Sequence, residues 1–390
     1  MQFGAGLSFL EETETAVEES LAAATDQLDQ VPDVAILFAS PHHGEAIERA
    51  AKQLAAATSP AGTSLGSLAE GVVGGEAEAE GIPALAVWVA SLPGASWDSS
   101  YLRATQMRDG VAISGWRAPD GPVGTVLVAD PYSFPVIPFV ASLAGSYPQM
   151  PVVGGLAVAG PGPGDARLIH DGEVHRSGAV ALSFGGQMEF RTVVSQGCRP
   201  VGKPAVVTAA DGIHIREIGG RPVLDFLQDL FDRLPEDEQD LVRHGLQLGI
   251  VVDEYQTDYG RGDFLVRAVM GADPESGALT VGEPIPVGRT VQFQVRDPLA
   301  ADEDLRMLLA QEKPAEGVLL FTCNGRGKRF FGFPHHDVAA VNEILRPSAV
   351  AGFFAAGELG PVGGTTFLHG YTATLATIGR APADPNQAFP

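Results

Sequence analysis

The residues best suited to chemistry lie close together in the last third of the chain, in the stretch Cys323-Asn324-Gly325-Arg326-Gly327. Glycine allows a turn to expose its backbone N–H groups, and an arginine guanidinium offers a fork of donors that fits a carboxylate. This pattern predicts a binding site for a small anionic or zwitterionic ligand. The alternative is that Arg326 pairs with an acidic neighbour in its own chain and that the glycines only shape the turn.

Two residues further along the chain could complete such a site. Glu358 lies in a glycine-bounded bend, where it could meet a ligand ammonium group or pair with Arg326. His369 lies directly before a predicted strand at 371–378. A histidine there either makes a hydrogen bond in the core or serves as an acid, a base or a ligand. The predicted ligand-binding residues are Cys323, Asn324, Gly325, Arg326, Gly327, Glu358 and His369.

The thiol of Cys323 supports a different interpretation. Nearby cations and exposed N–H groups could lower its pKa, and His335, His336 or His369 could then form a Cys-His nucleophilic pair with it. A lone cysteine usually behaves as a small, inert hydrophobic residue. We therefore predict no catalytic residue and a protein that is not an enzyme, with a thiol-dependent hydrolase or transferase as an alternative.

Paired histidines occur twice, as His42-His43 and His335-His336, each pair directly after a proline. Neighbouring residues on an extended chain point in opposite directions, so one pair cannot easily chelate one ion. Capping and packing at the start of a helix explain the pairs more simply. We predict no metal site, and because the sequence has no Walker loop or dinucleotide fingerprint we also predict no cofactor.

The elements that must position these residues occur as three similar units. Each unit reads as a buried strand, a helix, a glycine-punctuated strand and outer strands, which indicates duplicated supersecondary structure. The buried strands are predicted at 34–40, 125–130 and 317–323. Two residues link Ala39 to His42 in the first unit, whereas eleven separate Cys323 from His335 in the third. Connections of that length between a strand and a helix are usually either functional or disordered.

The longer connection also concentrates positive charge. It contains Arg326, Lys328 and Arg329. The chain as a whole has 48 acidic and 25 basic residues and a net charge of −23. Such a charge repels phosphates and anionic lipids, so we expect no nucleic-acid partner and no membrane partner.

Chain length and composition predict the fold class and the division into domains. The 390 residues, of which 45% are hydrophobic, suffice for more than one globular domain. We predict an α/β (mixed α+β) fold: two tandem domains with mixed β-sheets flanked by helices, built from repeated β-α-β-β units. The predicted parts are an N-terminal amphipathic helix in 1–30, a first domain in 31–220, a second domain in 221–380 and a loose tail in 381–390.

Two further features bear on the compartment. The chain has only two cysteines, Cys198 and Cys323, which is no disulfide framework. Its first residues lack a basic region and a long apolar run, and no stretch of about 18 apolar residues occurs. We therefore expect a soluble, cytoplasmic, acidic protein.

The order of three segments in the C-terminal third resembles the C-terminal domain of the FIST family (F-box and intracellular signal transduction). These segments are CNGRG, AGFFAAGELGPVGG and FLHGYT, and residues 253–297 resemble the same domain. Residues 31–200, with VAILFAS and TSLGSLAEG, are similar to the FIST N-terminal domain.

This resemblance implies a sensory or ligand-binding module for small ligands such as amino acids. We see no F-box and no fused signalling domain, so the output would pass to a separate signalling protein. The alternative is an interaction scaffold that binds a protein and no small ligand.

Overall fold

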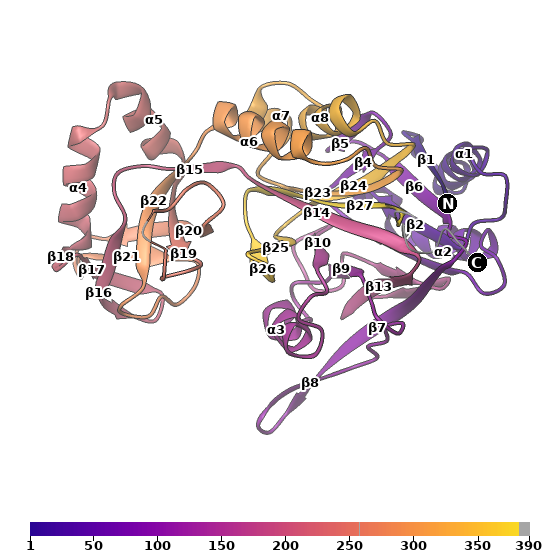
Figure 1. Cartoon of the computed structure of the whole chain (residues 1–390), viewed down its shortest axis with the longest axis horizontal. Coiled ribbons are helices and arrows are strands. Elements are labelled where there is room, and N and C mark those ends of the chain that lie inside the picture. The colour runs from indigo at the N-terminus through magenta and orange to yellow at the C-terminus, as the bar shows by residue number, and fades with distance from the viewer. Residues whose placement is uncertain (257, 382–390) are drawn as a thin grey trace, which may run out of the picture. The chain divides into compact units, whose positions relative to one another are not determined.

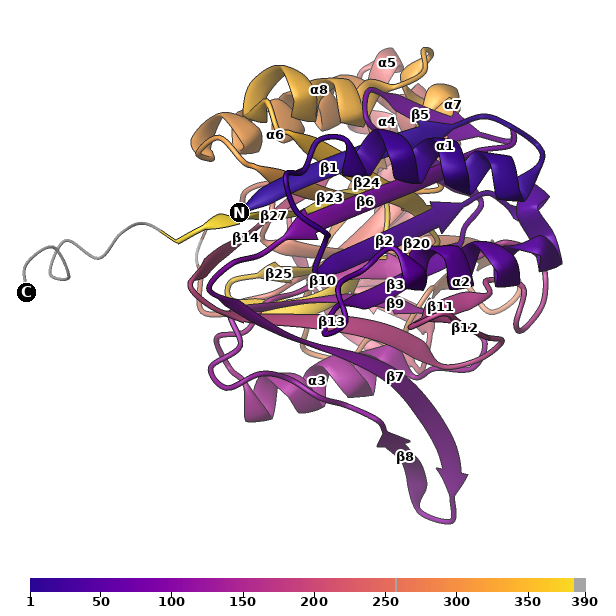
Figure 2. The same cartoon turned by 90° about the vertical axis from the view of Figure 1, so that its right-hand side faces the viewer.

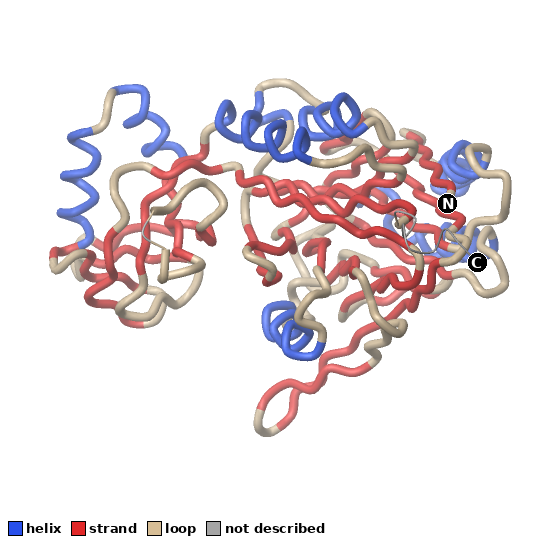
Figure 3. The backbone as a smooth tube through the Cα atoms, in the orientation of Figure 1, coloured by secondary structure: helices blue, strands red, loops and turns tan. Residues whose placement is uncertain are grey.

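The computed structural model describes residues 1–256 and 258–381 and has a mixed α+β fold, as Figures 1 and 3 show. The fold class predicted from the sequence is therefore confirmed. Apart from Ala381, the predicted loose tail lies outside the described residues. In the described part of the chain, no helix is long and apolar enough to cross a membrane.

Packing divides the chain into two compact units. The larger unit comprises Met1–Val194, Arg306–Leu368 and the chain from Ala373, and the smaller unit comprises Ser195–Leu305 and His369–Thr372. The larger unit thus combines segments from both sides of residue 220. The predicted sequence boundary at that residue does not coincide with the boundary between the compact units.

Three mixed sheets form in the described residues of the larger unit. The first has the order β1 (Gln2–Ser8), β6 (Leu85–Ser91), β2 (Val34–Ala39), β3 (Thr63–Leu68), β11 (Leu168–His170), β12 (Glu173–His175). The second has the order β26 (Thr365–His369), β25 (Glu358–Val362), β10 (Val152–Leu156), β9 (Gly124–Ala129), β13 (Ala179–Gly186), β7 (Ala95–Met107), β8 (Gly110–Ser114). The third has the order β14 (Met188–Gln196), β27 (Thr372–Arg380), β23 (Gly317–Cys323), β24 (Ala349–Ala355), β4 (Gly71–Gly74), β5 (Ala77–Glu80).

Helices accompany the sheets (Figure 2). Helices α1 (Thr13–Thr25) and α2 (Ile47–Ala56) contact the first sheet, and a 3₁₀ segment, Pro41–Ala46, precedes α2. Helix α3 (Val136–Ser146) packs on the second sheet. The remaining helices of the C-terminal third are α6 (Pro298–Gln311), α7 (Lys328–Phe331) and α8 (His336–Leu345).

The smaller unit has its own sheet and two helices in its described residues. Its strands are β15 (Cys198–Pro200), β16 (Ala205–Asp211), β17 (His214–Ile218), β18 (Arg221–Pro222), β19 (Leu246–Val251), β20 (Phe264–Asp273), β21 (Ala278–Val281) and β22 (Thr290–Arg296). Its helices are α4 (Val223–Arg233) and α5 (Glu236–Gly245), and their apolar faces pack on the core of that sheet.

The three predicted repeats are confirmed by the strand pairing. In each repeat a central strand runs parallel to the next strand, as β2 does to β3, β9 to β10 and β23 to β24. The same central strand pairs antiparallel with a later strand, which is β6, β13 or β27 respectively. Each repeat therefore has one topology, and the chain uses it three times.

In each repeat, the hairpin that follows the parallel pair of strands joins the sheet of a different repeat. Hairpin β4–β5 follows β3 in the chain but pairs with β24 of the third repeat. Hairpin β11–β12 follows β10 but pairs with β3, and β25 follows β24 but pairs with β10. The first repeat thus gives its hairpin to the third, the second gives its hairpin to the first, and the third gives its hairpin to the second. Each of the three sheets therefore contains strands from two repeats.

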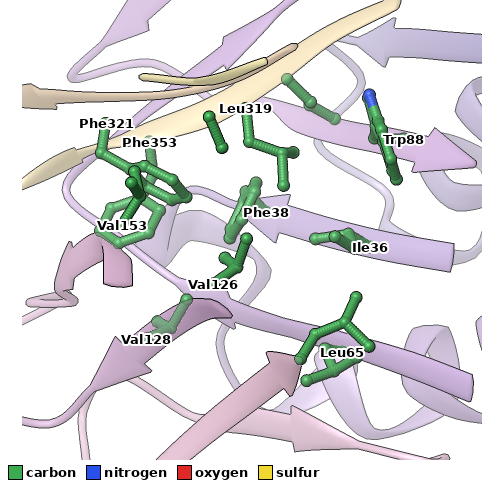
Figure 4. Packing of buried hydrophobic residues seen from close by; sticks show 14 of the residues in the cluster. Ile36, Phe38, Leu65, Trp88, Val126, Val128, Val153, Leu319, Phe321 and Phe353 are labelled. Carbon is green, nitrogen blue, oxygen red and sulfur yellow. The ribbon is translucent and has the colours of Figure 1, made fainter. Parts of the chain in front are cut away.

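Side chains from all three sheets meet in one apolar cluster, shown in Figure 4. Phe38 of the first sheet lies with its ring centroid 6.2 Å from that of Phe321 and 5.1 Å from that of Phe353, both from the third sheet. Val126 and Val153 bring the second sheet into the same cluster. Burial of apolar surface between the sheets therefore joins the three repeats.

The N-terminus differs from the prediction of a helix in 1–30. Residues 2–8 form an edge strand antiparallel to β6, and the helix is confined to Thr13–Thr25. A Cβ on Gly4 or Gly6 would lie 2.0 Å from a carbonyl oxygen of α1. The two glycines therefore let α1 lie directly on the strand. Because glycine has a low β propensity, the sequence does not predict this strand.

Candidate functional site

The predicted binding segment begins where β23 ends, at the buried Cys323. The chain turns there, because the Arg326 N–H donates to the Cys323 carbonyl over 2.8 Å. The Gly325 N–H donates to the Cys323 Sγ over 3.3 Å. Gly327 has φ of 78°, and a Cβ at this position would lie 2.6 Å from a Glu80 carboxylate oxygen. The turn thus requires glycine at 327 and directs the Arg326 side chain inward, where the residue is 1% exposed.

Asp337, at the start of α8, holds the Arg326 guanidinium. Nε of Arg326 donates to Oδ2 and Nη2 donates to Oδ1, each over 2.8 Å. The fork of donors that was expected to meet a ligand carboxylate is therefore occupied within the chain. The acidic neighbour that holds Arg326 in the described residues is Asp337 and not Glu358.

Further groups surround the Arg326–Asp337 pair. Thr322 donates its hydroxyl hydrogen to Asp337 over 2.5 Å, and Nδ1 of His336 lies 2.9 Å from the same carboxylate. The Arg326 guanidinium lies 5.1 Å from the ring centroid of Phe331, and that ring stacks on His336 at 3.4 Å. His336 therefore orders the ion pair and its aromatic cover.

Hairpin β4–β5 closes the cluster from the N-terminal half of the sequence. Oε1 of Glu78 accepts a 2.9 Å hydrogen bond from the N–H of Val338, in the first turn of α8. The backbone N–H of Glu78 donates to Nδ1 of His335 over 2.9 Å. Oε1 of Glu80 accepts from the Lys328 N–H over 2.8 Å. The hairpin thus holds the eleven-residue connection in its middle, at Lys328, and directly after its end, at His335.

Burial and neighbouring charges shift the pKa values of Asp337, Arg326 and Glu78. Burial alone would raise the pKa of Asp337, but the charge and hydrogen bonds of Arg326, with help from His336, hold it far below its usual range. Burial would lower the pKa of Arg326, yet Asp337 raises it above its ordinary value. Burial, and then the charge of Asp337, raise the pKa of Glu78 to about 8. The cluster therefore holds one ion pair beside a carboxyl group that keeps its proton at neutral pH.

Two polar atoms of the cluster are buried without a hydrogen-bond partner in the part of the chain that the structure describes. They are Nη1 of Arg326 and Oε2 of Glu78. A buried polar atom without a partner costs about 1–3 kcal/mol, so such atoms are rare in native cores. A donor and an acceptor are thus left unused within one cluster.

The other predicted site residues lie in different places. Asn324 stays partly exposed and donates to Glu70 over 2.6 Å, while Lys328 and Arg329 are exposed. Glu358 begins β25 opposite Gly155, buried in the second sheet, whereas Arg326 follows the third. His369 is buried at the end of β26 and belongs to the smaller unit.

Sequence reasoning missed Glu78 and Asp337. Asp337 carried a usable signal, because an acid in the first turn of a predicted helix, eleven residues after a buried arginine, is a plausible counter-charge. Glu78 lies in a Gly-Glu-Ala-Glu-Ala-Glu run whose alternation indicates only a strand. Nothing in that run shows that the hairpin joins another repeat.

Comparison with known proteins places these residues in two matched domains. The FIST N domain model matches residues 33–221 and the FIST C domain model matches residues 224–361. The chain belongs to the FIST family. Glu78 therefore comes from the FIST N domain, and Arg326 and Asp337 come from the FIST C domain. The resemblance found in the sequence is confirmed, and FIST domains are associated with sensory roles in signal transduction.

Relatives of similar length share this domain pair. A Mycobacterium tuberculosis protein, strain H37Rv, named as uncharacterized, is 43% identical over 383 residues, which are 96% of this chain and 99% of the relative. A Mycobacterium bovis protein, also named as uncharacterized, is 42% identical over 387 residues, which are 96% of this chain and 98% of the relative. These names add no ligand or activity to the family's sensory association.

Proposed function

We propose that the chain is a sensory module that binds a small zwitterionic or anionic ligand, such as an amino acid, without turning it over. The observation that carries this proposal is the pair of buried, unused atoms, Nη1 of Arg326 and Oε2 of Glu78. A ligand carboxylate would accept from Nη1. A ligand ammonium group would favour the ionised form of Glu78, which would release its proton to solvent and accept from the ammonium group through Oε2. Each contact would satisfy an atom that the folded chain leaves without a partner.

Ligand entry would require hairpin β4–β5 to move. Arg326 is 1% exposed and Glu78 is 4% exposed, so neither atom is reachable while the hairpin is docked. Binding energy would favour a conformation in which the hairpin has shifted enough to admit the ligand between Glu78 and Arg326, which is how a ligand shifts a two-state equilibrium. The displaced hairpin would change the surface that a separate signalling protein meets.

The Cys323 thiol would serve this turn rather than act as a nucleophile. Its Sγ accepts a hydrogen bond from the Gly325 N–H. When the first and third repeats are aligned by their strand pairing, Cys323 corresponds to Ser40. Ser40 Oγ likewise accepts a backbone hydrogen bond, from the Ala84 N–H. Both cysteines are buried thiols, which fits the reducing compartment of a cytoplasmic protein.

A thermal-shift screen tests the proposal with the twenty amino acids and a set of small carboxylic acids as probes. At 100 times its Kd, a ligand that binds only the folded state stabilises it by about 2.7 kcal/mol. We expect at least one probe to raise the Tm of the wild type and of Arg329→Ala, an exposed control on the same loop.

The matched variant is Glu78→Gln, which keeps an acceptor for the Val338 N–H but removes the carboxylate. We expect it to fold and to lose most of the shift given by a zwitterionic probe. If no probe at millimolar concentration stabilises the wild type, or if Glu78→Gln responds equally well, the site assignment is wrong.

A further inference from the structure

The chain contains one long segment without charge. Residues 131–164 include no Asp, Glu, Lys, Arg or His, in a chain whose net charge is −23. Helix α3 lies within this segment. Its buried side consists of Val136, Phe139, Val140 and Leu143, which pack on the second sheet. The other side includes Ile137, which is 53% exposed, so α3 presents an uncharged, partly apolar surface.

Beside α3, the hairpin β7–β8 extends away from the second sheet, as Figures 1 and 2 show. Strand β8 ends the strand order of that sheet, and among the described strands it pairs only with β7. Its outer edge therefore offers backbone N–H and C=O groups to another strand. Exposed Met107 and Val111 lie at the tip. A two-stranded hairpin alone is marginally stable in water.

A groove of about 400 Å³ lies between this hairpin and the loop before α3. Ala104 and Val111 line it from the hairpin, and Tyr132 and Phe134 line it from the loop. The exposed residues Val111 and Tyr132 thus line one depression. Exposed Ile137 follows in α3, two residues after Pro135, which also lines it. Contiguous exposed apolar surface of this kind marks an interaction site more often than isolated residues do.

Charge indicates what covers this face. The hairpin and the residues up to 118 carry Arg103, Arg108 and Arg117 but, after Asp98, only one acid, Asp109. Arg103 and Arg108 are exposed. Two copies of a chain with net charge −23 repel one another unless they meet on a face without acids. The α3 face has no charge, and the basic hairpin complements the acidic remainder of a second copy.

We propose that this face is the interface of a symmetric homodimer. Each copy would lay its β7–β8 hairpin across the groove and helix α3 of the other copy. Val111 and Ile137 would be buried, and Arg103 and Arg108 at the rim would be attracted by the net negative charge of the second copy. A two-fold arrangement of this kind uses the same patch on both subunits and closes on itself.

Sedimentation velocity of the full chain between about 1 and 100 µM tests the dimer, because these concentrations lie at or above a dissociation constant of about 10⁻⁶ M. We expect the wild type to sediment with twice the mass of one chain. Ile137→Glu and Val111→Glu should each weaken association at least about tenfold, since each buries a charge without a partner. Val31→Glu is the control, because Val31 is 61% exposed and precedes β2, away from this face.

Two further measurements separate this face from other interfaces. Arg108→Glu should weaken association more at low than at high salt, because salt screens exposed charges. Val111→Cys should form an interchain disulfide on mild oxidation, whereas Val31→Cys should not. A wild type that stays monomeric throughout overturns the proposal, as does a dimer that survives both glutamate substitutions. Association of the monomer with a different protein through this groove would also contradict it.

Discussion

The first and third repeats have the same topology but differ in the residue at one matched position, which is apolar in the first and ionisable in the third. Strand pairing aligns Leu37 with Gly66 in the first repeat and Leu320 with Gly352 in the third. A Cβ on either glycine would lie within 2.0 Å of the carbonyl oxygen of the leucine opposite. The two repeats therefore share a close backbone contact that fixes their register.

The difference lies in the hairpin that each repeat receives. In the first repeat, Gly66 pairs with Ile169, which pairs with Val174. In the third repeat, Gly352 pairs with Val73, which pairs with Glu78. Val174 packs on an apolar cluster, whereas Glu78 joins a buried ion pair. The same structural position thus holds a hydrocarbon in one repeat and a carboxyl group in the other.

This comparison shows that the scaffold does not need the buried charges. Burial of an ion pair often contributes less stability than apolar residues of similar volume would. The first repeat folds with an apolar residue at this position and a two-residue connection after its central strand. The third repeat retains three ionisable groups and an eleven-residue connection, which is why we connect the cluster with function.

The largest expected effect comes from removing the counter-charge of Arg326. Asp337→Ala should lower the free energy of unfolding by about 3–5 kcal/mol, because a buried cation loses its partner. Urea denaturation measures this effect. The double variant Arg326→Met/Asp337→Leu resembles the uncharged first repeat and should lose much less stability than the single variant. A loss below about 1 kcal/mol for Asp337→Ala would show that the buried pair is not needed for stability.

The reverse substitution in the first repeat should also be unfavourable. Val174→Glu places a carboxyl group where the first repeat offers an apolar cluster, so we expect a loss of about 1–3 kcal/mol. Thermal and urea unfolding check this value, with Val174→Leu as the size control. Equal stability of Val174→Glu and Val174→Leu would mean that both repeats tolerate a carboxyl group at this position.

The two repeats should respond to pH with opposite signs. Glu78 has a pKa raised to about 8 when folded, so between its unfolded value near 4.5 and about 8 the folded state binds more protons. Its contribution to stability then falls as pH rises, by at most about 1.4 kcal/mol per pH unit. Burial, with the charge of His42, lowers the pKa of His43 in the first repeat, so the contribution of His43 falls as pH drops below about 6.5.

Urea denaturation from pH 5 to pH 9, about the range over which these groups titrate, separates the two contributions. The difference between wild type and Glu78→Gln should decline with rising pH, and the difference between wild type and His43→Gln should increase. Parallel curves for wild type and Glu78→Gln would show that Glu78 titrates as an ordinary exposed carboxyl group.

The smallest expected effect concerns the exposed cations of the long connection. Lys328→Ala and Arg329→Ala should change the free energy of unfolding by less than about 0.5 kcal/mol, because both side chains lie in water. Urea denaturation of both variants checks this expectation. A loss as large as that of Asp337→Ala would mean that the whole cationic segment, and not Arg326 alone, holds the connection in place.

The sequence predicted the repeats and a glycine-shaped turn at Arg326, because strand periodicity and glycine placement are local signals. It could not predict the partner of that turn. Glu78 reaches α8 only because hairpin β4–β5 crosses to another repeat, which is a property of tertiary topology. Glu358 looked suitable by type, but its strand belongs to the second sheet. Strand β1 was missed for a related reason, since Gly4 and Gly6 gain their role only from contact with α1.

The side-chain NMR signal of Arg326 tests the central claim most directly. In ¹⁵N-arginine-labelled protein, the signal is assigned by its loss in Arg326→Lys, and the signal of Arg329 serves as the internal control. Amino acids that stabilise the wild type should shift the Arg326 signal and leave that of Arg329 unchanged, because the ligand carboxylate would accept from Nη1. If a stabilising amino acid leaves the Arg326 signal where it was, the ligand binds elsewhere and the account of the third repeat is wrong.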